Sequence, residues 1–313
     1  MVQATAPGKV ILFGEHAVVY GRPAIAVPVT QVRATAIVTP GSIGGARLVA
    51  PDLGIDVLLE EAAAEDALAA AVWQVQQVAG LACLPDFMLT VYSSIPIASG
   101  LGSGAAITAA IIRALAAYLK RSDLTSNERV AALTYEVEKI HHGTPSGIDN
   151  TVVAFEQPVY FVRRQPQNQV ETFQVAAPLR LLIGDTGIRS STKAVVMDVR
   201  RQWEADPTRF DTLFDGCGRI AAAARVAIEA GDVAATGRLM GENQALLQAM
   251  TVSSPELDRL ATAATEAGAL GAKLSGAGRG GNMIALVTAE TETAVRRALL
   301  AAGARSVFTS VIK

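Results

Sequence analysis

Hydrophobic and polar positions alternate in several short stretches of the chain. Phe87, Leu89 and Val91 are apolar and are separated by more polar neighbours, a period of two that is typical of a half-buried strand. Similar short apolar runs bounded by turn residues predict further strands. They lie at 158–162, 171–175, 179–187, 282–287 and 306–312.

Other stretches have the longer period of a helix. Val130, Leu133, Val137 and Ile140 fall on one apolar face of a predicted helix, while Glu138 lies at a different angle. Thr125 and Glu128, spaced T-x-x-E, predict a capping box at its start. Helical patterns also dominate 192–268 and 291–303.

Strands mixed with helices of uneven length favour an α+β fold over a regularly alternating parallel sheet. The 313 residues are enough for two domains of ordinary size, and the new strand after Ala177 suggests the boundary. We therefore expect an N-terminal domain at 1–177 and a C-terminal domain at 178–313.

Composition and charge narrow the class of protein. Half of the residues are hydrophobic, and Lys+Arg 27 against Asp+Glu 29 gives a net charge of −2, which argues against a nucleic-acid partner. No apolar run reaches the roughly 18 residues of a membrane span, and the first residues lack the order of a secretion signal. Cys83 and Cys217 are isolated, with no metal-binding spacing. The sequence predicts a soluble cytoplasmic protein with no membrane partner.

The first of three glycine-rich segments, 6–21, contains Gly8-Lys9 and then Glu15-His16 after a glycine turn. Gly8-Lys9 resembles the end of a P-loop, but Val10 stands where a serine or threonine belongs, so that interpretation fails. Lys9 at a predicted strand start could be a surface lysine, and His16 a loop histidine.

The second segment, 96–106, carries three alternating glycines and then enters an alanine-rich helix. Glycines let backbone amides approach a ligand closely, and the positive end of a helix is a ready anion site. We expect a phosphate-binding loop, with a flexible loop and helix cap as the alternative.

The third segment, 273–281, matches G-x-G-x-x-G at Gly276, Gly278 and Gly281. A dinucleotide-binding fingerprint requires a strand before it and a helix after it. Because a strand is predicted at 282–287, the dinucleotide interpretation is rejected.

Asp149 lies near the end of the stretch IHHGTPSGIDNT, 140–151, in a predicted turn that follows a helix. Aspartate is common in turns because it bonds to nearby backbone, so a structural role is one interpretation. The other is a catalytic base.

Together these segments resemble the motifs of the galacto-, homoserine, mevalonate and phosphomevalonate (GHMP) kinase superfamily, over nearly the whole chain. GKVILFGEHAVVYG and HHGTPSGIDN are most similar to the mevalonate kinase branch. The resemblance implies a ribosomal-protein-like N-terminal domain and a ferredoxin-like C-terminal domain, with the active site in the cleft between them.

The implied reaction transfers the γ-phosphoryl group of ATP to the 5-hydroxyl of mevalonate, giving 5-phosphomevalonate and ADP. Asp149 matches the catalytic aspartate and Lys9 the lysine beside it, while Glu138 and Ser103 would bind Mg²⁺. A kinase for another small alcohol, such as a phosphorylated mevalonate, is the nearest alternative, and a non-catalytic binding protein of the same fold is a further one. A homodimer is left open.

The resemblance also implies two binding segments. The ATP phosphates would be bound by Gly100, Leu101, Gly102, Ser103, Gly104, Ala105 and Ala106. The mevalonate pocket would be lined by Glu15, His16, Thr192 and Ala277, with His16 as a hydrogen-bond donor. Two residues depart from the family pattern. Gly104 stands where the family often has a serine, and Arg279, which replaces a common glycine, would either contact phosphates or face solvent.

Overall fold

The computed structural model describes residues 1–41, 44–63, 66–96, 100–142 and 145–313, with His141 and His142 described by their backbone alone. The chain forms two compact units. Unit 1 comprises Met1–Lys9, Thr30–Ile97 and Leu101–Glu156, and unit 2 comprises Val10–Val29, Ala98–Gly100 and Gln157–Lys313. Strands β1 (Val2–Phe13) and β2 (Ala24–Pro40) contribute residues to both. The predicted boundary after residue 177 stays a prediction.

Unit 1 contains a sheet with the order β4-β3-β5-β2, in which β1 also pairs with β2. Its remaining strands are β3 (Ala46–Ala50), β4 (Ile55–Leu58) and β5 (Phe87–Ser93). Phe87, Leu89 and Val91 of β5 are buried, while Met88 and Tyr92 are exposed, which confirms the alternation read from the sequence. The apolar side chains of β5 therefore face the core.

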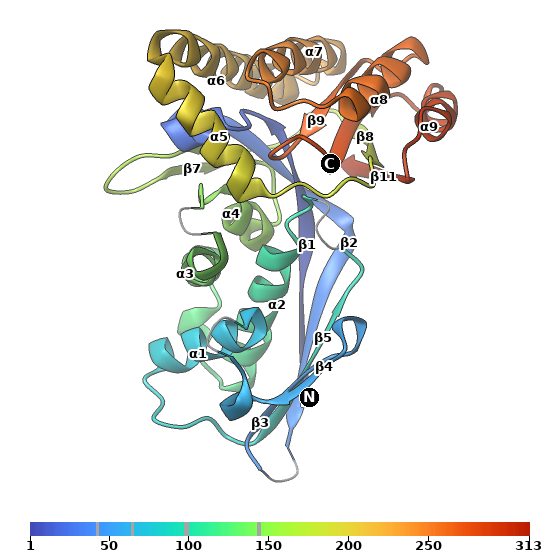
Figure 1. The fold of residues 1–313 in the computed structure, drawn as a ribbon. Helices are drawn as coiled ribbons and strands as arrows, with labels where there is room; N and C mark the ends of the chain where they lie inside the picture. Colours follow the sequence, from blue (N-terminus) through green and yellow to red (C-terminus); the bar gives the residue numbers. More distant parts are fainter. Residues whose placement is uncertain (42–43, 64–65, 97–99, 143–144) are drawn as a thin grey trace. The chain divides into compact units, whose positions relative to one another are not determined.

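Four helices cover one face of this sheet (Figure 1). They are α1 (Ala67–Ala79), α2 (Ser103–Tyr118), α3 (Asn127–His142) and α4 (Ile148–Phe155). The alanine-rich α2 packs against α1, α3 and α4, because short side chains let helices approach closely. Single-turn 3₁₀ helices lie at Ala17–Tyr20, Pro51–Leu53, Leu59–Glu61 and Ser122–Leu124.

Helix α3 corrects two sequence predictions. Its cap is Ser126, whose hydroxyl accepts the N–H of Arg129 at 3.2 Å, whereas the Thr125 hydroxyl donates to the Ser122 carbonyl. Ile140, predicted on the apolar face, is 53% exposed, while Glu138 is only 8% exposed. The end of α3 therefore buries a carboxylate in place of an apolar side chain.

Unit 2 contains a four-stranded antiparallel sheet with the order β11-β8-β10-β9. Its strands are β8 (Leu179–Asp185), β9 (Gly271–Ser275), β10 (Asn282–Val287) and β11 (Ser306–Ile312). The predicted strands at 282–287 and 306–312 are confirmed. A smaller ladder joins the first part of β2 to β6 (Val159–Val162) and β7 (Gln169–Thr172), so β7 begins and ends earlier than the predicted 171–175.

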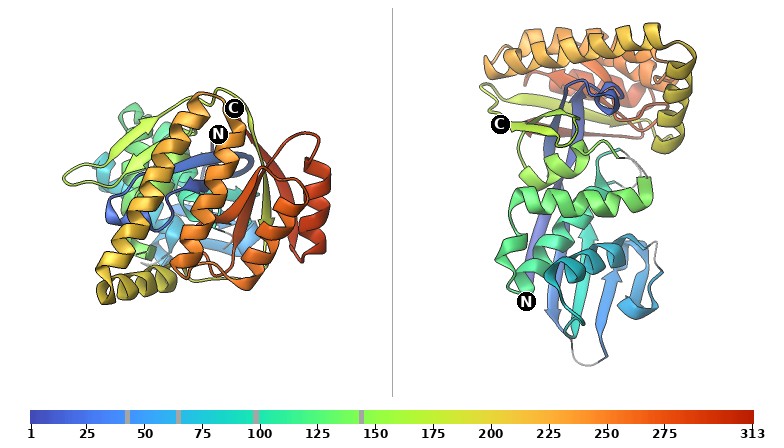
Figure 2. Two further views of the ribbon diagram at one scale, coloured as in Figure 1. Left: turned by 90° about the horizontal axis from the view of Figure 1, so that it is seen from above. Right: turned by 90° about the vertical axis from the view of Figure 1, so that its left-hand side faces the viewer.

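The helical region predicted at 192–268 consists of four helices, and a fifth lies between β10 and β11. They are α5 (Thr192–Ala205), α6 (Pro207–Glu229), α7 (Val233–Ala249), α8 (Pro255–Glu266) and α9 (Glu292–Ala301). Figure 2 shows α6 and α7 lying side by side, and the two helices pack together. Pro255 opens α8, and the Ser254 hydroxyl accepts the Leu257 N–H, which satisfies a donor in the helix's first turn.

The two cysteines lie in different units and are both free thiols. Cys83 is exposed, whereas Cys217 of α6 belongs to the hydrophobic core of unit 2. Burial, together with the nearby Glu15 carboxylate, raises the pKa of the Cys217 thiol to about 12. No helix among the described residues is both long and apolar enough to cross a bilayer.

Candidate active site

Lys9 and Asp149 form an ion pair in unit 1. The Lys9 Nζ lies 2.9 Å from Asp149 Oδ2, and the two side chains are 4% and 32% exposed. Lys9 lies inside β1 and not at the predicted strand start. Asp149 lies in the first turn of α4 and not in a loop turn, because Gly147, with φ 93°, ends the Pro-Ser-Gly turn and begins the helix. The structure thus brings the two residues together and leaves solvent access to the carboxylate alone.

The glycine-rich start of α2 lies directly against Lys9. The Lys9 N–H donates to the Leu101 carbonyl at 2.9 Å. A Cβ placed on Gly102 would lie 2.8 Å from Cγ of Lys9, and φ of Gly102 is 71°. Only glycine fits both the contact and the backbone conformation, so Gly102 lets the start of the helix approach the lysine. Residues 97–99 of the predicted 96–106 loop lie outside the described residues.

The start of α2 has the features of an anion site. Gly102 is the N-cap and makes no side-chain hydrogen bond to the helix. The first N–H groups of α2, at Ser103, Gly104 and Ala105, have no carbonyl partner within the helix, and the helix dipole adds a partial positive charge there. This segment can therefore bind phosphate oxygens.

Glu138 of α3 is the second carboxylate of this cluster. Desolvation by burial, followed by repulsion from Asp149, raises the pKa of Glu138 to about 7, and Lys9 opposes the shift. A Cβ on Gly104 would lie 3.8 Å from Glu138 Oε1, so the first turn of α2 faces this carboxylate with no side chain between them. The carboxylates of Glu138 and Asp149 repel each other and have the single ammonium of Lys9 as a counterion. A bound cation would reduce this repulsion.

The cluster fits Mg²⁺ better than a metal held by protein alone. Among the described residues, no group of three or more His, Cys, Asp or Glu side chains is placed to hold a metal. Mg²⁺ usually takes one or two carboxylates and completes its shell with phosphate oxygens and waters. A single glutamate beside a helix start that can bind phosphate oxygens is compatible with that requirement.

Asn150 helps to hold the two carboxylate-bearing helices together, a role that the sequence did not predict. Its Nδ2 donates to the Ala131 carbonyl of α3 at 2.9 Å, which ties α4, the helix of Asp149, to α3, the helix of Glu138. The Thr151 hydroxyl donates to the Gly147 carbonyl at 2.6 Å and closes the first turn of α4. Apart from following Asp149 within two positions, neither residue carries a sequence signal for this role.

His16 lies in unit 2 after the turn at Gly14. Its Nε2 lies 2.9 Å from the Ala277 carbonyl oxygen, which can only accept, so Nε2 carries the proton. Burial lowers the pKa of His16 to about 4, against the opposing effect of this hydrogen bond, so the ring is neutral at pH 7. A neutral imidazole has one N–H, and the protein already uses it. The prediction of His16 as a donor is therefore wrong, since its free Nδ1 can only accept.

Glu15 is fully buried in an ion pair with Lys273, whose Nζ donates to Glu15 Oε1. Burial lowers the pKa of Lys273, and Glu15 opposes that shift. In the sequence, Lys273 stands out only as the first residue of the glycine-rich segment 273–281, and no local pattern connects it to Glu15. The Glu15 carboxylate is bound to the protein's own lysine.

Thr192 and Ala277 occupy different settings in unit 2. Thr192 is exposed at the first position of α5, after its N-cap Ser191. Ala277 is half-buried in the segment between β9 and β10. The glycine-rich segment thus joins two antiparallel strands, which confirms that it is not a dinucleotide fingerprint.

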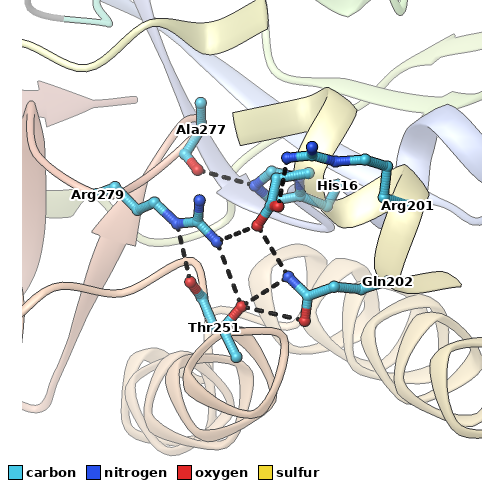
Figure 3. Close-up of polar contacts among 7 residues, drawn as sticks. His16, Arg201, Gln202, Thr251, Ala277 and Arg279 are labelled. Atoms are coloured by element: carbon cyan, nitrogen blue, oxygen red, sulfur yellow. Dashed lines mark hydrogen bonds and ion pairs between the residues drawn. The ribbon is translucent and has the colours of Figure 1, made fainter. Parts of the chain in front are cut away.

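Arg279 is bound to its neighbours, which neither sequence interpretation anticipated. Its guanidinium forms an ion pair with Asp198 of α5 at 2.5 Å, and Nε donates to the Thr251 carbonyl at 3.1 Å (Figure 3). Gln202 donates to the same Asp198 and to the Thr251 hydroxyl. Hydrogen bonding by Arg279 lowers the pKa of Asp198. The network links the β9–β10 segment to α5 and to the residues after α7.

Comparison with known proteins identifies the family. The description "GHMP kinases N terminal domain" matches residues 66–157, and "GHMP kinases C terminal" matches residues 224–305. A mevalonate kinase of Thermococcus sibiricus is 35% identical over 99% of this chain and 96% of its own. The chain therefore belongs to the GHMP kinases.

Two solved structures agree with this assignment. L. major mevalonate kinase, in complex with R-mevalonate, is similar with a TM-score of 0.85 at 29% identity, over 100% of this chain and 96% of that one. Methanococcus jannaschii mevalonate kinase gives a TM-score of 0.86 at 26% identity, over 99% and 98%. The protein has the two-domain GHMP kinase fold, with helices and sheets mixed as the sequence predicted.

Proposed function

We propose that the protein is an ATP-dependent kinase that transfers the γ-phosphoryl group of ATP to the 5-hydroxyl of mevalonate, giving 5-phosphomevalonate and ADP. The observation that carries the proposal is the Lys9–Asp149 pair at 2.9 Å beside the glycine-rich start of α2. The names of the full-length relatives, mevalonate kinases at about a third identity, support the choice of substrate.

Asp149 would act as the general base. Its carboxylate is 32% exposed, so a substrate hydroxyl can reach it, and the ammonium of Lys9 lies 2.9 Å away, where it also faces the reacting hydroxyl. As the hydroxyl oxygen attacks the γ-phosphorus and the bond to ADP breaks, the hydroxyl proton passes to Asp149. Lys9 would steady the negative charge on the reacting oxygens.

The start of α2 would position the nucleotide. Phosphoryl transfer depends chiefly on positioning and charge stabilisation, which backbone N–H groups can supply. We assign this role to the segment Gly100, Leu101, Gly102, Ser103, Gly104, Ala105 and Ala106.

Glu138 would hold Mg²⁺, with the Ser103 hydroxyl or a water taking the place left by Gly104. The ion supplies positive charge to the phosphates when bound. The ion would in return offset the burial and the repulsion from Asp149 that raise the pKa of Glu138.

Glu15, His16, Thr192 and Ala277 would form the substrate-binding set. In this assignment the Nδ1 of His16 accepts a hydrogen bond from a mevalonate hydroxyl. Glu15 contributes indirectly, by holding the adjacent His16 in place. A phosphorylated substrate would require additional free cations. Lys9, Lys273 and Arg279 are each paired with a carboxylate, so none of these three supplies such a cation.

The test is a coupled ADP-release assay with Mg²⁺ and ATP that compares mevalonate, phosphomevalonate, homoserine and galactose. We expect turnover with mevalonate to exceed that with each other alcohol by at least about a hundredfold in kcat/KM. A preference for another of the four would replace the substrate assignment. Binding of mevalonate with no ADP release from any of them would support the non-catalytic alternative.

A further inference from the structure

His16 is the central residue of an uncommon tight turn. Its backbone has φ 59° and ψ −50°, and the Ala17 N–H donates to the Glu15 carbonyl at 2.6 Å. A three-residue turn with positive φ at its centre is rare and strained. Non-glycine residues seldom adopt this conformation, so neighbouring contacts must hold it.

Two residues of β9 and one residue just after it contact this segment. The Ser275 hydroxyl accepts the Ile11 N–H at 3.1 Å and donates to the Ile11 carbonyl at 2.8 Å. Lys273 donates to the Glu15 carboxylate, and the Ala277 carbonyl accepts from His16. Lys273 and Ser275 are alternate residues of β9 and share one face, whereas Ala277 follows Gly276, whose φ is 95°, and makes its contact through its backbone. Together the three residues contact the end of β1 and the turn.

The backbone that leads into the turn is also closely packed. A Cβ on Gly14 would lie 2.4 Å from the Pro23 carbonyl oxygen, so the backbone before Glu15 is packed against the start of β2. The Val18 N–H donates to the Gly14 carbonyl at 3.1 Å. The turn at His16 is therefore held by these contacts as well.

Stability alone does not account for the Lys273–Glu15 pair. Both side chains are 0% exposed, and the Lys273 Nζ also donates to the Leu274 carbonyl at 2.7 Å. Removing two charges from water is costly, and buried pairs of this kind can often be replaced by apolar residues without loss of stability. Such a pair does fix the geometry of the backbone that carries it.

We propose that Lys273 is a positioning residue for the kinase reaction: through Glu15 it holds the strained turn that orients Nδ1 of His16 toward the substrate. The inference rests on the proposed function, in which His16 binds mevalonate. Lys273 itself, fully buried, does not touch the substrate. Loss of the pair lets the turn relax and misplaces the acceptor nitrogen.

The decisive variant is the double substitution Glu15→Gln/Lys273→Met. It removes both charges at nearly constant volume, so no buried ion is left unpaired and the fold is retained. We expect KM for mevalonate to rise about tenfold, with KM for ATP and kcat within about twofold, because a contact made equally in the ground and transition states affects KM alone.

Two further variants complete the experiment. Lys273→Met alone leaves Glu15 as an unpaired buried carboxylate and is expected to melt at a lower temperature than the double variant. Glu15→Asp keeps the charge but shortens the reach, and should also raise KM for mevalonate. The matched control is Arg225→Met, which breaks an ion pair with Glu171 in the same unit and should leave both KM values unchanged.

The outcomes separate the inference from the function on which it rests. If the wild-type protein does not phosphorylate mevalonate, or His16→Ala leaves its KM for mevalonate unchanged, the proposed function or the assignment of His16 fails. If both hold and the double variant and Glu15→Asp have wild-type KM values, the pair is structural only and the inference is overturned. Raised KM for mevalonate in both variants, with Arg225→Met unaffected, supports it.

Discussion

Replacing Asp149 by asparagine removes the proposed general base and keeps the size of the side chain. An amide cannot take the hydroxyl proton, and general bases typically contribute about 10²–10⁴-fold, or about 3–5 kcal/mol of the barrier. Glu138 is the nearby carboxylate that could take over as the base, since repulsion from Asp149 contributes to its raised pKa. It is buried, however, and is assigned to the metal. We therefore expect kcat to fall by about a thousandfold.

The cost of the same substitution to stability is much smaller. Removing one partner of a fully buried ion pair costs about 3–5 kcal/mol. Here solvent reaches Asp149, which is 32% exposed, and loss of its charge lowers the pKa of Glu138, which can then neutralise Lys9. The expected loss is about 1 kcal/mol, or a fall in melting temperature of about 2 °C.

The assay is ADP release at saturating ATP and mevalonate, together with thermal melting of the same samples. Glu156→Gln is the matched control, because Glu156 closes the other end of α4 and pairs with Arg33 and Arg113. It should lose as much stability while kcat stays within about twofold. A kcat of the asparagine variant within about tenfold of wild type would refute the assignment of Asp149 as the base.

Three further outcomes are expected. Glu138→Gln should raise the Mg²⁺ concentration for half-maximal rate by about tenfold or more, and an unchanged Mg²⁺ titration would exclude Glu138 as a ligand. Gly102→Ala should lower the unfolding free energy by more than about 1 kcal/mol, because its Cβ would lie 2.8 Å from the Lys9 side chain. Gly104→Ala should lower it less, because the nearest atom to its Cβ would be 3.8 Å away. Equal losses for the two variants in a denaturant titration would contradict this. His16 is neutral in the folded protein down to its pKa of about 4 but takes up a proton near 6.5 when unfolded, so stability falls as pH drops through this range, by at most about 3 kcal/mol. His16→Gln should lack this component, and identical pH dependence of melting in variant and wild type would disprove it.

Sequence periodicity was sufficient for most of the regular elements from β5 onward, but not for β2, β3, β4 or α1. The strands at 282–287 and 306–312 were located because their apolar runs are bounded by turn residues. Helix α4 was missed, since it has only eight residues and follows the turn-forming Pro-Ser-Gly. Short helices are held by tertiary packing more than by their own pattern, and here α4 packs against α2 and α3.

The candidate site was predictable where a motif carried it and not elsewhere. Lys9 and Asp149, 140 positions apart, were singled out by resemblance, and the structure places their side chains in contact. The Lys273–Glu15 pair was not anticipated, because charged residues are expected at the surface unless a partner is known. A partner 258 positions away leaves no trace in local spacing. The geometry of the His16 turn likewise depends on residues of β9 that no local pattern connects to it.

Because one free thiol is exposed and the other is buried, thiol labelling can report the unfolding of unit 2. A maleimide added to the native protein should label Cys83 alone, since buried and protonated Cys217 has neither access nor thiolate character. Modification of the second thiol then marks the moment at which the interior of unit 2 opens. Mass spectrometry of samples along a denaturant series would then give the denaturant concentration at which the core of unit 2 opens, without any engineered probe.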